Sequence, residues 1–161
     1  MKFAKPLLVL AMASLSLAAC AKYNGEDRGR PVMPSQSNAK WVAECSGCHM
    51  AYPPGLLPAA SWKKVMGGLD KHFGTDASLS AADNAEITNY LVTYESNRWT
   101  SSAAPLRITD GEWFKVKHIG KGNIDPAVWS RASVKSKGNC AACHQGAERG
   151  DFNENSTRIP N

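Results

Sequence analysis

One five-residue pattern, Cys-x-x-Cys-His, occurs twice in this chain, at residues 45–49 and at residues 140–144. On one turn of helix, two cysteines three positions apart can each form a thioether with a haem vinyl group, and the histidine that follows then lies under the iron. The repeated pattern therefore predicts two covalently attached c-type haems. The residues that would hold them are four cysteines and two proximal histidines: Cys45, Cys48, His49, Cys140, Cys143 and His144.

Other uses of the four cysteines are two disulfides in an oxidising compartment or a zinc site with four thiolates. Zinc sites built from two such cysteine pairs usually separate the pairs by about 15–20 residues, whereas 91 residues lie between Cys48 and Cys140. A thioredoxin-like redox pair would need a βαβ setting, and no strand-like alternation is sustained. Because none of these sites requires a histidine after each cysteine pair, haem attachment is the favoured interpretation.

The distal iron ligands are predicted by subtraction. Beyond the two proximal histidines, the chain contains only His72 and His118. Three methionines are alternative candidates for the distal positions. Met33 lies in an expected flexible tether, and Met50 is next to a proximal histidine and would have to fold back to reach an iron. Met66 lies on the apolar stripe of an expected helix, where a core role is favoured. We therefore expect both irons to have two histidine ligands.

The pairing of these histidines is less constrained than their number. Proximity along the chain favours His49 with His72 on the first haem and His118 with His144 on the second. The distal residue follows the proximal one in the first half and precedes it in the second, so a simple duplication is not indicated. A crossed pairing stays open at this point.

Residues 1–19 have the composition of an export signal, because two lysines precede an apolar stretch too short to span a bilayer. The stretch ends in Leu-Ala-Ala-Cys, which resembles a bacterial lipobox in which Cys20 is diacylated and becomes the N-terminus. Ordinary cleavage after Ala21 is the alternative. Both predict a periplasmic protein, and lipid on Cys20 would also anchor it to the membrane.

Removal of the two signal lysines lowers the net charge from +5 to +3. No basic cluster accompanies this small excess, so nucleic acid is excluded as a partner. At 161 residues the chain has room for one domain or two small ones.

The mature chain divides into three parts. Residues 20–37 are polar and contain proline and glycine, which predicts a flexible tether. Residues 38–98 are expected to form the first haem domain and residues 99–161 the second. Three helices are expected in the first domain: one capped by Asn38, one from about Ala59 to His72, and one capped by Ser80.

The second domain shows little periodicity before residue 124. One further helix is expected from Pro126 to Lys137, with Asp125 as N-cap and Gly138 as terminator. The fold class is therefore mainly α, without a sheet.

The first domain is small for a self-sufficient core, so a covalently held haem would supply the missing apolar centre. Four residues are expected to pack against it: Trp41, Trp62, Tyr90 and Leu91. The carbonyl of Pro53 or Pro54 is expected to accept a hydrogen bond from the His49 ring and to fix its tautomer.

Five stretches carry a resemblance to a known family: CHMAYPPGLLP, SWKKVMGGLDKHFGTDASLS, ITNYL, PLRIT and CAACHQGA. Together they cover about residues 40–147 and resemble the bacterial dihaem cytochrome c family called DHC. The resemblance implies an N-terminal class I cytochrome c-like helical domain and a second haem domain with little regular structure. It implies bis-histidine ligation by His49, His72, His118 and His144.

The same resemblance implies electron transfer to a small high-spin, oxygen-binding c-type cytochrome, with a membrane cytochrome b as donor. An electron carrier suits an iron with two strong ligands, because no position is left for a substrate. The alternative is a dihaem enzyme or gas-binding protein, peroxidase-like, with one open iron. The chain is short for that role, and it offers no further histidine as an acid–base group.

Overall fold

The computed structural model describes residues 31–95, 104–120 and 124–161. The expected export signal, Cys20, the first part of the expected tether and the boundary between the two expected domains lie outside the described residues. Within the described ranges the fold is mainly helical and has no strand, as predicted. The four α-helices are α1 (Ala39–Cys45), α2 (Ala59–Met66), α3 (Ala81–Thr93) and α4 (Glu112–Lys115).

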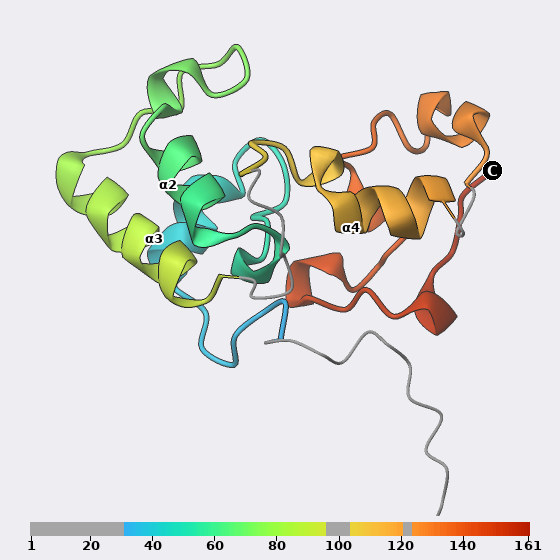
Figure 1. Ribbon diagram of the computed structural model, residues 1–161, viewed down its shortest axis with the longest axis horizontal. Helices are drawn as coiled ribbons and strands as arrows, with labels where there is room; N and C mark the ends of the chain where they lie inside the picture. The colour runs from blue at the N-terminus through green and yellow to red at the C-terminus, as the bar shows by residue number, and fades with distance from the viewer. Residues whose placement is uncertain (1–30, 96–103, 121–123) are drawn as a thin grey trace, which may run out of the picture.

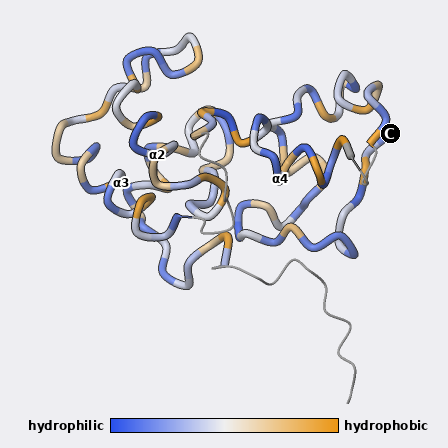
Figure 2. The backbone as a smooth tube through the Cα atoms, viewed as in Figure 1, coloured by the Kyte–Doolittle hydropathy of each residue, from blue (hydrophilic) through white to orange (hydrophobic). Residues whose placement is uncertain are grey.

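Figure 1 shows α2 and α3 at one end of the molecule and α4 with the irregular second half at the other. Hydrophobic positions are interspersed among hydrophilic ones along both halves (Figure 2). No helix in the described ranges is long and apolar enough to cross a membrane.

The N-termini of α1 and α3 are formed by the predicted caps. The amide of Trp41 donates to Oδ1 of Asn38 at 2.8 Å. At α3, the amide of Asp83 donates to Oγ of Ser80 at 3.1 Å, and the Ser80 hydroxyl donates to the Asp83 carboxylate at 2.7 Å. Each cap satisfies an amide that has no partner inside its helix. Both helix starts are therefore confirmed.

The second helix is shorter than predicted. Helix α2 ends at Met66, and the chain continues through Gly67 and Gly68 into a 3₁₀ turn, η2 (Leu69–Lys71). Two consecutive glycines are costly inside a helix because they lose the most backbone freedom on folding. The expected continuous helix up to His72 is therefore wrong. The interruption places His72 in a turn, where its amide donates to the carbonyl of Leu69.

The core of the first half lies between α1, α2 and α3. Its buried members are Trp41, Ala51, Leu57, Trp62, Met66, Ile87, Tyr90 and Leu91. Each large side chain buried in this way contributes about 1.5–3 kcal/mol to folding. The indole of Trp62 also donates to the carbonyl of Pro54 at 2.7 Å. This hydrogen bond fixes the proline-rich loop that follows the first Cys-x-x-Cys-His motif.

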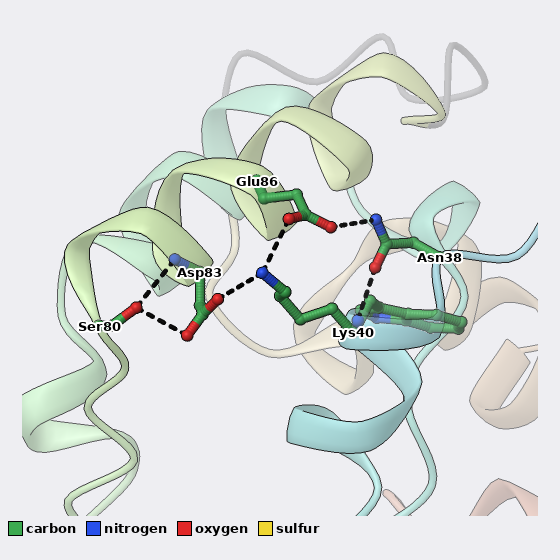
Figure 3. Close-up of polar contacts among 6 residues, drawn as sticks. Asn38, Lys40, Ser80, Asp83 and Glu86 are labelled. Atoms are coloured by element: carbon green, nitrogen blue, oxygen red, sulfur yellow. Dashed lines mark hydrogen bonds and ion pairs between the residues drawn. The ribbon is translucent and has the colours of Figure 1, made fainter.

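A polar cluster joins the outer faces of α1 and α3 (Figure 3). The ammonium of Lys40 lies 2.5 Å from Oδ1 of Asp83 and 2.9 Å from Oε2 of Glu86. The side-chain amide of Asn38 donates to Glu86 at 3.0 Å. Hydrogen bonding to Lys40 lowers the pKa of both carboxyl groups. The cluster thus connects two helices that are distant in the sequence.

The second half contains a helix that the sequence did not predict and lacks the one that it did. Helix α4 continues as a π-helical turn, η4 (Val116–Gly120). The helix expected from Pro126 to Lys137 is wrong, because only the 3₁₀ turn η5 (Pro126–Ser130) forms. The Asp125 cap is present, and its carboxylate accepts from the amide of Ala127 at 2.8 Å.

Local chemistry explains why this helix stops. The segment is rich in serine and valine, which favour a helix less than alanine or leucine does. The hydroxyl of Ser130 donates to the carbonyl of Ala127, and Arg131 adopts an extended backbone with ψ 140°. Lys135 then has a φ of 69°, in the left-handed region, which redirects the chain toward the second motif.

The described end of the expected tether is part of the fold. The amide of Gly55 donates to the carbonyl of Val32 at 2.9 Å. A Cβ on Gly55 would lie 2.7 Å from the Val32 backbone, and a Cβ on Gly150 would lie 2.5 Å from the Met33 side chain. Residues 31–33 therefore run in close contact with both halves, which only glycines at these two positions permit.

Candidate functional site

The first Cys-x-x-Cys-His motif begins at the C-terminal end of α1. Cys45 is the last residue of the helix and is half-buried, whereas Cys48 is exposed in the turn that follows. Burial, with a smaller effect of Glu44, raises the pKa of the Cys45 thiol to about 11. Because burial disfavours the thiolate, this position suits a neutral sulfur, such as that of a thioether.

The two histidines of the first half lie close together. The ring centroids of His49 and His72 are 6.2 Å apart, with planes at 31°. Burial, and then the neighbouring His49, lowers the pKa of His72. The neutral imidazole, which is the form that binds a metal, is therefore favoured at this position.

The backbone partner of His49 differs from the expected one. Nδ1 of His49 lies 2.7 Å from the carbonyl oxygen of Met50, so the expected bond to Pro53 or Pro54 is wrong. The carbonyl of Pro54 already accepts from the Trp62 indole. The contact to Met50 still serves the expected purpose, because it engages one ring nitrogen and leaves the other for a metal.

The second motif lies on a 3₁₀ turn, η6 (Cys140–Ala142), and not on an α-helix. The amide of His144 donates to the carbonyl of Cys140 at 2.8 Å, which holds the motif in a compact turn. Burial raises the pKa of Cys140 to about 11 and also raises the pKa of Cys143. Nδ1 of His144 lies 3.2 Å from the hydroxyl of Thr157.

His118 lies on the π-helical turn that follows α4. Its ring stacks on Phe114 with centroids 4.1 Å apart and planes at 14°, and its Nδ1 lies 2.9 Å from the Phe114 carbonyl. The ring centroids of His118 and His144 are 6.1 Å apart, with planes at 77°. Burial is the main cause that lowers the pKa of both histidines. Single π-helical turns of this kind often occur at functional sites.

The spacing of the two histidine pairs tests whether an iron ion fits between them. A metal–imidazole bond is about 2 Å long and a ring nitrogen lies about 1.2 Å from its ring centre, so imidazoles on opposite sides of one metal ion have centroids roughly 6 Å apart. The observed separations are 6.2 Å and 6.1 Å. Both pairs therefore fit an iron held between two imidazoles.

The alternative uses of the cysteines have no counterpart in the structure. The four motif cysteines are all free of disulfides. In the part of the chain that the structure describes, no three histidine, cysteine or acidic side chains gather into a cluster that could hold a metal ion alone. The zinc site with four thiolates is therefore not supported.

A small, largely apolar cavity of about 40 Å³, partly open to solvent, lies at the second motif. Cys140, Cys143 and both histidines of the second pair line it. Leu56, from the proline-rich loop of the first half, lines it as well. The first half thus contributes to the wall of the second site.

Several site residues were not predicted from the sequence: Tyr52, Phe114, Phe152 and Thr157. A signal existed for Phe114, because it precedes His118 by four residues and would share its face on a helix. The contact of Thr157 with His144 depends on how an irregular tail folds back, and no local pattern indicates it.

Among the methionines considered as ligands, Met66 is buried in the core of the first half and Met33 packs against that core.

The sequence model of the DHC family, described as dihaem cytochrome c, matches residues 41–152. The chain belongs to the dihaem cytochrome c family. It accordingly binds two c-type haems with iron, and proteins of this family are generally electron carriers.

Solved structures agree with this assignment. A diheme cytochrome c from Rhodobacter sphaeroides is 43% identical, with a TM-score of 0.65 over 72% of this chain and 97% of that one. A second structure, of DHC purified from the same organism, is 47% identical, with a TM-score of 0.63 over 73% and 98%. A diheme cytochrome type c from Shewanella baltica OS155 is 37% identical, with a TM-score of 0.66 over 76% and 93%. No curated protein matches the chain.

Proposed function

We propose that this dihaem cytochrome c is a periplasmic electron-transfer protein in which two histidines ligate each iron. The observation that carries the proposal is the pair of neighbouring imidazoles in each half, with ring centroids 6.2 Å apart for His49 and His72 and 6.1 Å apart for His118 and His144. Sequence proximity favours the same pairing. A crossed pairing would require these contacts to be broken.

When bound, each haem supplies a one-electron iron couple. The cysteines of each motif would hold it by two thioethers, and the paired histidines would both ligate its iron. An iron with two histidine ligands would leave no site for a substrate or gas, which suits a carrier and disfavours a peroxidase. Histidine in place of methionine at the distal position also lowers the reduction potential.

The fixed ring nitrogens support this role. In His49, His118 and His144, Nδ1 is within hydrogen-bond distance of Met50, Phe114 and Thr157, respectively. Such contacts orient a ligand ring before it binds the metal and reduce the rearrangement that accompanies a change of charge. Three of the histidines, His72, His118 and His144, are half-buried, and burial favours the neutral imidazole that binds a metal.

The optical spectrum of the reduced holoprotein, recorded with and without carbon monoxide, tests this proposal. An unchanged Soret band supports two six-coordinate irons, and a shifted band would favour the gas-binding or peroxidase-like alternative. His72→Ala and His118→Ala should each open one haem to carbon monoxide. Met66→Leu is the matched control, because it alters a buried core residue and should leave both haems closed.

Export, anchoring and partners extend the proposal. We infer that the acceptor is a small oxygen-binding c-type cytochrome and the donor a membrane cytochrome b, on the strength of the family resemblance. Stopped-flow oxidation should be faster with such an acceptor than with an ordinary small cytochrome c.

Cys20→Ser should release the protein from membranes, and a mature N-terminus at residue 22 would instead indicate ordinary cleavage.

A further inference from the structure

One side chain contacts both haem-binding motifs. The ring of Tyr52 stacks on the imidazole of His49, with centroids 4.7 Å apart and planes at 29°. Its hydroxyl donates to the carbonyl of Gly138 at 2.7 Å. The same carbonyl accepts from the amide of Cys140 at 3.0 Å. One tyrosine thus connects a proximal histidine of the first half to the backbone that carries a cysteine of the second.

The geometry of this connection is tight. Tyr52 is half-buried and packs against the core of the first half, so its ring has a fixed position. A Cβ on Gly138 would lie 3.0 Å from the tyrosine hydroxyl oxygen. A glycine at this position therefore lets the hydroxyl approach the carbonyl closely. The two partners are 86 residues apart in the sequence, so the contact exists only in the folded chain.

We propose that Tyr52 is a positioning residue that couples the two haem sites, by orienting the His49 ring and by providing a continuous contact path from that ring to Cys140. This inference rests on the proposed function, because it assumes that electrons move between the two haems. It concerns a residue that lies outside both motifs and is not an iron ligand.

The coupled step is the passage of one electron between the irons. One iron is oxidised as the other is reduced, and no bond forms or breaks. Tyr52 is neither oxidised nor deprotonated in this step. The side chain acts as the medium between the sites. Its hydroxyl is joined to the backbone of the second half by the hydrogen bond to the Gly138 carbonyl. Without this bond, the path from the tyrosine ring to Cys140 would include a through-space step.

The test measures the rate of electron redistribution between the haems of the holoprotein after flash photoreduction, together with the low-spin ferric EPR spectrum. Tyr52→Phe keeps the stacked ring and removes the hydrogen bond. We expect a severalfold slower redistribution with an unchanged EPR signal of the first haem. Tyr52→Leu removes both contacts, so the rate should fall further and the EPR signal of the first haem should shift.

Gly138→Ala perturbs the same bond from its other end, because the added methyl group would lie 3.0 Å from the tyrosine hydroxyl oxygen and crowd it. It should slow redistribution as Tyr52→Phe does, and the double variant should be no slower than either single one. Tyr94→Phe is the matched control, since Tyr94 is another partly buried tyrosine of the first half and contacts Tyr90 instead.

The outcomes separate this inference from the proposed function. Wild-type rates in Tyr52→Phe, Tyr52→Leu and Gly138→Ala would overturn the role of Tyr52 and leave the electron carrier standing. Absence of redistribution in the wild-type holoprotein, together with binding of carbon monoxide, would instead overturn the proposed function. If the leucine variant does not fold, the phenylalanine and alanine variants still decide the question.

Discussion

Phe114 holds His118 in two ways at once: their rings are stacked 4.1 Å apart, and the Phe114 carbonyl lies 2.9 Å from Nδ1 of the imidazole. The two residues are four positions apart, where an α-helix turns into a π-helical turn. A carbonyl that would normally accept a backbone amide of its own helix is thereby within reach of a side chain. The orientation of His118, the proposed distal ligand of the second haem, is thus set within its own helical segment.

Phe114→Leu should therefore disturb the second haem and spare the first. Leucine keeps most of the buried apolar volume, so we expect a loss of about 1 kcal/mol in the free energy of unfolding. Loss of the stacked ring should let His118 rotate, which shifts one ferric EPR signal. Met66→Leu, a core change in the first half, is the control. An unchanged EPR spectrum in Phe114→Leu would refute the role of the stack.

The two histidine pairs differ in the angle between their rings, which is 31° for His49 and His72 and 77° for His118 and His144. Two ligand imidazoles would split the iron d orbitals differently when the angle between their planes differs. We therefore expect the ferric holoprotein to give two distinct low-spin EPR signals of equal intensity. His118→Ala should remove only the signal from the nearly perpendicular pair. One signal that accounts for both irons would contradict this prediction.

The contact of residues 31–33 with both halves predicts that two glycines cannot be replaced. Gly55→Ala would place a methyl group 2.7 Å from the Val32 backbone and should lower the free energy of unfolding by about 1–3 kcal/mol. Gly68→Ala is the control, because its nearest contact would be an ordinary 3.5 Å. Thermal unfolding of both holoproteins measures the difference. Equal midpoints would mean that the segment can move away freely.

The parts of this structure that the sequence predicted well depend on interactions between near neighbours. The Asn38 and Ser80 caps each join residues three positions apart, so the local pattern was sufficient. The candidate ligands could be found because the chain contains four histidines and two motifs. The structure brings His49 close to His72 and His118 close to His144, in the pairs that proximity had favoured.

The failures have physical reasons as well. The apolar pattern continues to Leu69, but the helix ends at Met66 because two glycines follow it. The pattern therefore predicted a longer helix than the backbone forms. The segment after Asp125 has residues that favour a helix start and a helix end, but its interior residues have low helix propensity. Only a 3₁₀ turn forms there. Contacts such as that of Tyr52 with Gly138 join residues far apart in the sequence, and no local pattern could reveal them.

The Lys40 cluster predicts a pH-dependent contribution to stability. Its carboxyl groups on Asp83 and Glu86 have pKa values below their ordinary values of 3.8 and 4.5, chiefly because Lys40 donates hydrogen bonds to them. A lowered folded-state pKa gives stability that is fully present above the ordinary value and is lost as the pH falls through the folded one. Lys40→Met should therefore be less stable than wild type at neutral pH, and this difference should shrink below about pH 4 and in high salt. Lys64→Met, which alters an exposed lysine of α2, is the control, and urea unfolding across this pH range is the measurement. A difference that does not depend on pH would mean that Lys40 stabilises the helices through its aliphatic stem alone.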